Sequence, residues 1–76
     1  MITVKFFASL RDEIGAGQLQ LTLPDPATVA GVWAHVSPER PLDEGILAAV
    51  NHDYADAAQV VRDGDEIAFF PPVTGG

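Results

Sequence analysis

The sequence predicts an α+β fold in which one main helix packs on a four- to five-stranded mixed sheet. Apolar residues alternate with other residues near both ends of the chain, a pattern typical of half-buried strands. One central segment instead repeats its apolar residues at helical spacing. Hydrophobic residues make up 47% of the 76 residues, which is enough for one small core and argues against disorder.

Residues 2–9 are expected to form the first strand, because apolar side chains alternate along them. The core face of this strand would carry Ile2, Val4, Phe6 and Ala8. Phe7 then falls on the opposite face, beside Lys5. The next residues, 10–15, are expected to form a short helical turn that stops at Gly15.

A second strand and the main helix are expected next. Residues 18–23 alternate and bury their three leucines, and the preceding Gly-Ala-Gly spacer suits a hairpin connection. Residues 29–36 place apolar side chains at i, i+3, i+4 and i+7, which is one face of a helix. Thr28 is the expected N-cap. Pro38 should end the helix, because the residue before a proline avoids helical angles.

The second half of the chain is expected to complete the sheet. After a loop at 37–45, the apolar run at 45–51 is short enough to be a buried strand. The stretch that follows is the hardest to interpret. It is expected to hold one short edge strand around Tyr54 and another around Val60.

The last strand is expected at 66–70, after a turn at 62–66 in which Gly64 supplies a positive φ. Alternation puts Ile67 and Phe69 on the core face and leaves Ala68 and Phe70 outside. Pro71 ends the strand, because proline cannot donate to the ladder. A hairpin, one helix and further strands in this order form a β-grasp arrangement, in which the first and last strands lie side by side.

The charge of the chain restricts its possible partners. Eleven acidic residues against four basic ones give a formal net charge of −7. Phosphate backbones would repel such a surface, so no nucleic-acid partner is expected, and basic protein surfaces are favoured instead. The sequence contains no apolar run of about 18 residues, so no membrane span is predicted, and it shows no signal-peptide pattern. The absence of cysteine fits a cytoplasmic protein.

The body of the domain, expected at residues 1–70, has no recognisable catalytic or metal site. His35 and His52 fall in different elements with no cysteine to support them, so no metal site is predicted. Ser9 and Ser37 lack the glycine context of an activated serine. Chemistry is therefore expected elsewhere in the chain.

The tail at 71–76 reads PPVTGG and is the expected reactive segment. Pro71 and Pro72 favour an extended exit, which at about 3.1 Å per residue would reach on the order of 18 Å from the last strand. Gly75 and Gly76 lack a Cβ and can enter a channel too narrow for side chains. The carboxylate of Gly76 would need activation, most simply as an acyl-adenylate, before a sulfur donor could convert it into a thiocarboxylate. The alternative is a glycine-rich disordered end without a function.

These residues resemble the small-subunit family of molybdopterin synthase, a family of ubiquitin-like sulfur carriers. The resemblance is carried by DGDEIAFFPPVTGG (63–76), by VKFFASLRDEIG (4–15) and by LAAVN (47–51). Residues 37–46 and 52–62 match only in length and character.

The resemblance implies a specific role for Gly76. A separate activating enzyme that uses ATP and magnesium would adenylate it and convert it to a thiocarboxylate (1-thioglycine). The large synthase subunit, in an expected heterotetramer, would hold the tail while the sulfur passes to cyclic pyranopterin monophosphate. This chain would bind no cofactor and would not be an enzyme on its own. The residues expected to contact partners are those of the tail and the outward aromatic pair: Pro71, Pro72, Val73, Thr74, Gly75, Phe7 and Phe70.

Two alternatives stay open at this point. A sulfur carrier for thiamine thiazole synthesis shares the fold and the Gly-Gly end, but that family usually lacks the two prolines. A ubiquitin-like protein modifier would form isopeptide bonds through Gly76. Lys5 is the only lysine of the chain, so chains of this protein linked to itself would be nearly impossible.

Overall fold

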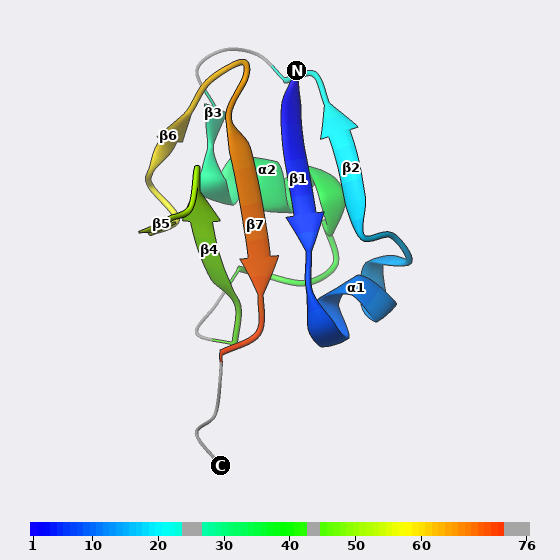
Figure 1. Ribbon diagram of the computed structural model, residues 1–76. Helices are drawn as coiled ribbons and strands as arrows, with labels where there is room; N and C mark the ends of the chain where they lie inside the picture. The colour runs from blue at the N-terminus through cyan, green and yellow to red at the C-terminus, as the bar shows by residue number, and fades with distance from the viewer. Residues whose placement is uncertain (24–26, 43–44, 73–76) are drawn as a thin grey trace.

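The structure, a computed structural model, describes residues 1–23, 27–42 and 45–72. Its main sheet has five strands in the order β2-β1-β7-β4-β5, and α2 (Val29–Val36) crosses one face of it (Figure 1). These strands are β1 (Ile2–Phe6), β2 (Gln18–Leu21), β4 (Leu47–Val50), β5 (Asp53–Ala55) and β7 (Glu66–Phe70). β1 and β7 are parallel neighbours, and the other pairs are antiparallel. The predicted β-grasp fold is confirmed.

The strand predicted at 2–9 is too long, because the chain turns soon after β1. Phe7 is still extended, with a φ of −123°, and it donates its N–H to the carbonyl of Phe69 at 3.2 Å. Ala8 then takes a positive φ of 54° and opens helix α1 (Ala8–Ile14). Ala8 is therefore exposed, and its predicted place in the core is wrong. Alternation alone gives no signal for such a turn.

Helix α1 begins earlier than the helical turn predicted at 10–15, but it ends as predicted. Gly15 caps it with a φ of 86°, the left-handed conformation in which glycine is favoured. β2 pairs with β1 as the hairpin prediction requires, but it is shorter than 18–23. Leu23 lies beyond β2 and still packs against the core.

The predicted helix α2 is confirmed at both ends. The hydroxyl of Thr28 accepts the N–H of Gly31 at 3.0 Å, which satisfies one of the free donors of the first turn. The helix ends at Val36, and Ser37, the residue before Pro38, is its C-cap. On the buried face, the indole N–H of Trp33 donates to the carbonyl of Arg40 at 2.6 Å, so the loop after the helix is fixed to the core.

The second half departs from the predictions in two places. β4 lies within the strand predicted at 45–51, but only Ala48 is buried in it. Leu47 and Ala49 lie on the uncovered side of the sheet, and Val50 is partly buried against the core. The expected strands around Tyr54 and Val60 are β5 and β6 (Val60–Val61). β6 pairs with β3 (Ala27–Thr28) in a separate two-stranded sheet, which the sequence did not predict. Gly64 takes the predicted positive φ, 92°.

The core fills the space between the main sheet and α2. Phe69 lies at its centre, with its ring centroid 4.9 Å from that of Trp33 and 6.1 Å from that of Phe6. Within the described residues, twelve apolar side chains are at most 5% exposed, namely Ile2, Val4, Phe6, Leu10, Val29, Val32, Trp33, Ile46, Ala48, Val61, Ile67 and Phe69. On the opposite face of the sheet, the described part of the chain places no helix (Figure 1). Among the described helices, none is long and apolar enough to cross a membrane.

Candidate functional site

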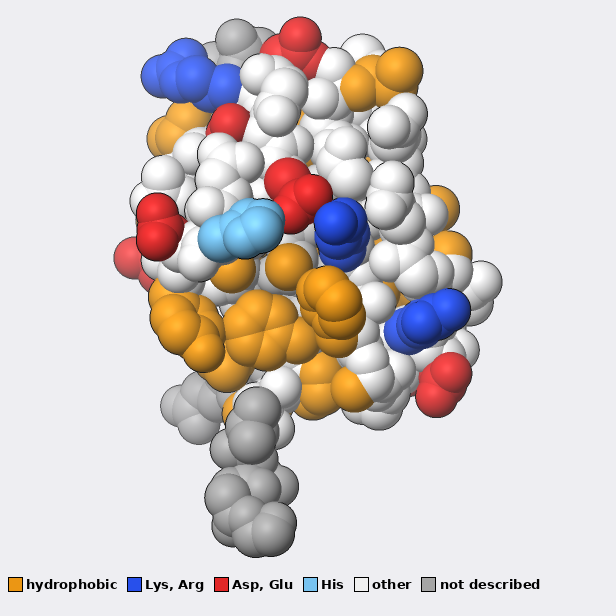
Figure 2. Space-filling view, in the orientation of Figure 1, with side chains coloured by type: hydrophobic (Ala, Val, Ile, Leu, Met, Phe, Trp, Pro, Cys, Tyr) orange, Lys and Arg blue, Asp and Glu red, His pale blue; other side chains and the backbone are white. Residues whose placement is uncertain are grey.

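The uncovered face of the main sheet, called the outer face below, carries the candidate site. Its side chains alternate with the buried ones along β1, β7, β4 and β5. They are Thr3, Lys5, Leu47, Ala49, Tyr54, Glu66, Ala68 and Phe70, and Phe7 follows directly after β1. In Figure 2 apolar side chains form a band across this face, close to where the chain leaves β7.

Three aromatic side chains form what we call the aromatic band. Phe7 is 49% exposed, as its predicted outward position requires. Phe70 also points outward as predicted, but it is half-buried because its ring lies 5.9 Å from the ring of Tyr54, centroid to centroid. Tyr54 itself is 80% exposed. An exposed apolar cluster of this kind marks an interaction surface, so the predicted contact roles of Phe7 and Phe70 stay predictions with a suitable geometry.

Tyr54 was missed as a site residue because its strand could not be aligned from the sequence. In the structure it pairs with Ala49, so the two side chains share the outer face. The register is set by Asn51 and His52, which take φ values of 50° and 75° in a two-residue hairpin turn. Asparagine is typical of such turns, but histidine is not, so only half of the usual turn signal is present.

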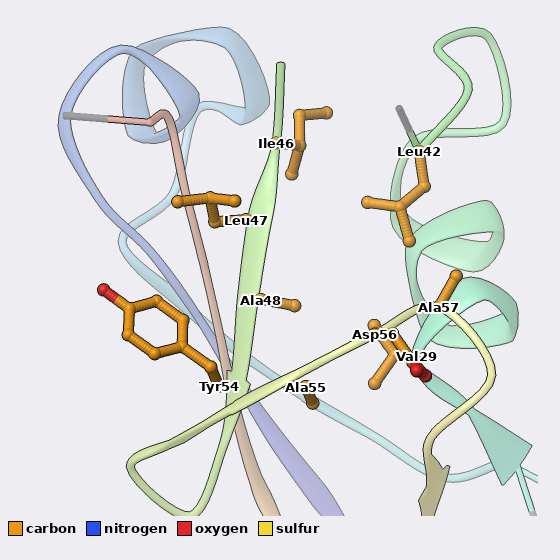
Figure 3. Close-up of a pocket in the computed structure, with 9 residues that line it drawn as sticks. All are labelled: Val29, Leu42, Ile46, Leu47, Ala48, Tyr54, Ala55, Asp56 and Ala57. Atoms are coloured by element: carbon orange, nitrogen blue, oxygen red, sulfur yellow. The ribbon is translucent and has the colours of Figure 1, made fainter. Parts of the chain in front are cut away.

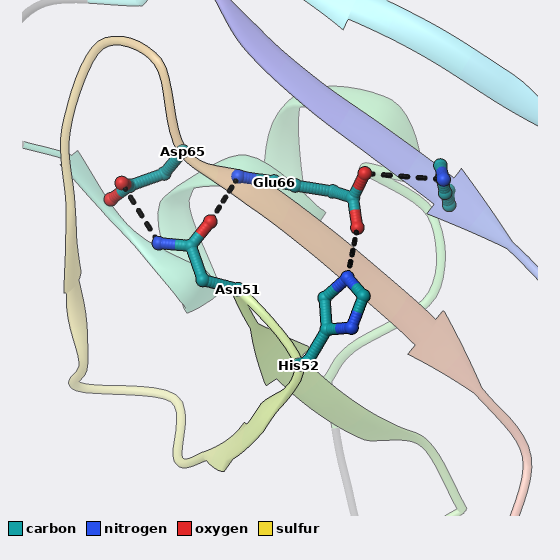
Figure 4. A network of polar contacts seen from close by, with 5 residues as sticks. Asn51, His52, Asp65 and Glu66 are labelled. Carbon is teal, nitrogen blue, oxygen red and sulfur yellow. Dashed lines mark hydrogen bonds and ion pairs between the residues drawn. The ribbon is translucent and has the colours of Figure 1, made fainter.

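A carboxylate lies at the centre of the polar part of the outer face. Oε1 of Glu66 is 3.1 Å from Nζ of Lys5, and Oε2 is 3.2 Å from Nε2 of His52 (Figure 4). The hydrogen bond from Lys5 lowers the pKa of Glu66, and the positive charge of Lys5 acts in the same direction. Glu66 is therefore a stable anion at neutral pH, at one end of β7, and Phe70 of the aromatic band lies at the other end.

Asn51 holds the β4–β5 turn against the start of β7. Its side-chain oxygen accepts the N–H of Glu66 at 3.0 Å, and its amide nitrogen donates to Oδ1 of Asp65 at 3.1 Å (Figure 4). Asp65 also accepts the N–H of Arg62 at 2.8 Å. This bond, followed by the one from Asn51, lowers the pKa of Asp65. The turn that carries His52 is thus fixed in position.

A separate apolar pocket of about 540 Å³ lies between β4, β5 and the start of α2 (Figure 3). It is lined by Val29, Leu42, Ile46, Leu47, Ala48, Tyr54, Ala55, Asp56 and Ala57. The carboxylate of Asp56 already accepts the N–H of Ala58 at 3.0 Å, and the hydroxyl of Tyr54 points away from the pocket in Figure 3. The described lining therefore offers no pair of groups for acid–base or nucleophilic chemistry.

The described residues bring no three His, Asp or Glu side chains together as a possible metal site. His35 is exposed on α2, far along the chain from the outer-face residue His52. The tail begins with Pro71, which is half-buried, and Pro72, which is exposed. The predictions for 73–76, which include Val73, Thr74, Gly75 and Gly76, lie outside the described residues.

Comparison with known proteins gives consistent results. Residues 4–76 match the ThiS family. The chain is 42% identical to the molybdopterin synthase sulfur carrier subunit of Haemophilus influenzae and 39% identical to the protein of that name from Escherichia coli, in each case over 100% of both chains. Among solved structures, SAMP1 from Haloferax volcanii aligns with a TM-score of 0.80 and 26% identity, covering 99% of this chain and 98% of that one.

A second solved structure, the small archaeal modifier protein 1 from Methanosarcina acetivorans, also has a TM-score of 0.80, at 25% identity over 99% of this chain and 95% of its own. The structural neighbours support the ubiquitin-like β-grasp class, which the strand order already indicates. The family match spans nearly the whole chain, and two full-length relatives agree with it. On these grounds the chain belongs to the ThiS family.

Proposed function

We propose that this chain is the sulfur-carrier subunit of molybdopterin synthase. The observation that carries the proposal is the end-to-end identity, 42% and 39%, with two curated proteins of that name. The C-terminal sequence PPVTGG, directly after β7, adds a chemical reason. A segment without large side chains at its end can enter a narrow active site in another protein.

The proposed chemistry takes place at the carboxylate of Gly76. In a separate activating enzyme, which supplies ATP and magnesium, a carboxylate oxygen attacks the α-phosphate and pyrophosphate leaves. A sulfur donor equivalent to hydrosulfide then displaces AMP and leaves the thiocarboxylate. In the large synthase subunit this sulfur passes to cyclic pyranopterin monophosphate, and water restores the carboxylate.

The rest of the chain would position the tail and would not act on the substrate. Pro71 and Pro72 restrict the backbone where it leaves β7, and the aromatic band lies beside this exit. The net charge of −7 is suited to a basic partner surface. The chain would therefore be a non-catalytic subunit in a cytoplasmic heterotetramer with the large subunit, and it would hold no cofactor of its own.

The first test is the position of the C-terminus. Adding one alanine after Gly76, or deleting Gly76, should abolish sulfur transfer in a reconstituted synthase, because a reacting atom misplaced by about 1 Å loses most of its reactivity. Circular dichroism should show an unchanged fold. The thiocarboxylate is detected as a mass gain on a C-terminal fragment, since oxidation of Met1 adds nearly the same mass to the intact chain. Full activity of the extended chain, with trimming excluded, would contradict the proposal.

The second test is Gly75→Val. A β-branched side chain should block activation or transfer by steric exclusion. If the proposed tail is not part of the packed fold, the melting temperature should stay within about 2–4 °C of wild type, because substitutions outside the core contribute little to stability. Differential scanning fluorimetry and the reconstituted assay measure the two effects. A large fall in melting temperature would mean that the tail belongs to the packed fold.

A protein-modifier function is the second candidate, because the chain resembles two archaeal proteins whose names include SAMP1 at 25–26% identity. The two functions leave different products. A sulfur carrier ends as a free thiocarboxylate or carboxylate, whereas a modifier becomes joined through Gly76 to a lysine of another protein. Isolation of such conjugates from the native host would favour the modifier function. The other alternative, a sulfur carrier for thiamine thiazole synthesis, would be favoured by sulfur delivery to a thiazole precursor.

A further inference from the structure

A small hollow lies on the outer face between the polar side chains and the aromatic band. Its volume is about 240 Å³. It is lined by Lys5, Phe7, Ala49, His52, Glu66 and Ala68. In Figure 2 it lies between the row of charged and histidine side chains and the apolar band. Pockets for small-molecule ligands measure roughly 300–1,000 Å³, so this hollow is smaller than most of them and has room for a single side chain.

The floor of the hollow is low because two small residues are neighbours in the sheet. Ala68 on β7 pairs with Ala49 on β4, and on its other side with Lys5 on β1. The next outward residues along β7 in either direction are Glu66 and Phe70, which are both much larger. Two adjacent methyl groups surrounded by long side chains leave a depression with an apolar base.

The walls of the hollow differ in chemistry. On one side stands the half-exposed ring of Phe7, and on the other the carboxylate of Glu66, whose residue is 31% exposed. A side chain that enters would therefore meet an aromatic ring, two methyl groups and an anion, with Lys5 and His52 beside that anion. A long apolar stem with a cationic head satisfies all three, and the guanidinium of arginine adds stacking on the ring and two parallel hydrogen bonds to a carboxylate.

The present partners of Glu66 do not prevent such a contact. His52 is 85% exposed and Lys5 is 37% exposed, so both bonds are surface interactions. Surface ion pairs contribute little to stability, so exchanging both of them for one bidentate partner costs little. The chain as a whole is strongly acidic, which favours a cation over an anion as the incoming group.

We infer that this hollow receives an arginine side chain from the protein that docks on the outer face, with Glu66 as its anion. The inference rests on the proposed function, since the docking protein meant here is the large subunit of molybdopterin synthase. The hollow is continuous with the aromatic band, so one partner surface can cover both.

The first experiment measures the affinity of the full chain for the large subunit of the same organism by titration calorimetry. Glu66→Gln keeps the size of the side chain and should weaken binding about tenfold, because a charge-assisted pair is lost. Lys5→Met removes the competing cation and should raise the affinity. The matched control is Glu39→Gln, since in the described ranges the side chain of Glu39 has no hydrogen bond or ion pair, and its affinity should stay within about twofold.

The second experiment fills the hollow. Ala68→Leu should weaken binding about tenfold or more, since overpacking a contact site displaces the incoming group. Ala49→Leu fills the same floor from β4 and gives an independent result if the first variant folds poorly. Circular dichroism and thermal unfolding of the free chain confirm that the variants keep the fold.

The other outcomes overturn the inference in distinct ways. Weaker binding of Lys5→Met with tighter binding of Glu66→Gln would mean an anionic group in the hollow. No effect of either charge variant would mean an apolar group, and no effect of both leucine variants would mean an empty hollow. Absence of wild-type binding would overturn the proposed function together with this inference, whereas strong wild-type binding that Glu66→Gln leaves intact would overturn only the inference.

Discussion

The two faces of the main sheet use the same kinds of residue for different purposes. Phe69 and Phe70 are neighbours in β7, yet Phe69 is fully buried against Trp33 while Phe70 lies on the outer face against Tyr54. The inner face is closed by α2, so its apolar side chains are removed from water within the chain itself. On the outer face, Tyr54 is 80% exposed and nothing in the described chain covers it.

This difference separates the residues that stabilise the fold from those that are available for binding a partner. Burial of a large apolar side chain stabilises whichever state removes it from water. On the inner face that state is the folded chain, and on the outer face it is a complex. Substitutions on the two faces should therefore change different measured quantities, even one residue apart in sequence.

The largest expected effect is on the inner face. Phe69→Ala should lower the free energy of unfolding by about 3–5 kcal/mol, because it leaves a cavity between Phe6 and Trp33. For a chain of this size that is a large part of the total stability. Phe70→Ala should cost only about 1 kcal/mol, from the lost contact with Tyr54. Urea unfolding followed by circular dichroism compares them, and equal losses would abolish the distinction between the faces.

The next effect is on binding through the outer face. Phe70→Ala or Phe7→Ala should each weaken binding to the large synthase subunit by about 2 kcal/mol or more, as expected for aromatic anchors of an interface. Val60→Ala is the matched control, since Val60 is 42% exposed but lies on β6, away from the outer face. Titration calorimetry gives the affinities. Unchanged binding of both phenylalanine variants would place the docking surface elsewhere.

Much of the fold was predictable because strong local signals agreed with the final packing. The apolar spacing in α2, its cap at Thr28 and its end before Pro38 all pointed to the same helix. The two faces of β7 followed from alternation, and the chain obeyed it because one side of this strand is fully covered. Ala8 was misplaced because a single left-handed residue changes the direction of the chain without changing the apolar pattern.

The site was predictable only in part, for a related reason. Phe70 could be placed outward because it lies on β7, and Phe7 because it directly follows β1, and both strands alternate clearly. Tyr54 and His52 reach the same face through a tight turn with an unusual residue in it, so their register depends on hydrogen bonds made by Asn51. Such long-range bonds have no local signature. The pairing of β3 with β6 was missed for the same reason.

The smallest expected effect concerns the charges of the outer face. The pKa of Glu66 is held below its ordinary value of 4.5, chiefly by the hydrogen bond from Lys5. A carboxyl whose pKa is lowered by folding adds stability above its unfolded pKa and loses it as the pH falls through the folded pKa. Glu66→Gln should therefore be slightly less stable than wild type at pH 7. The difference in stability between Glu66→Gln and wild type should begin to shrink near pH 4.5 and disappear at lower pH.

Urea unfolding over this pH range measures this difference in stability, with Glu39→Gln as the control for removing one negative charge. A gap that persists at low pH would mean that the shape of the side chain, and not its charge, matters. Because this bond is exposed, its contribution to stability should be far smaller than that of Phe69. The charge of Glu66 would then be available mainly for recognition.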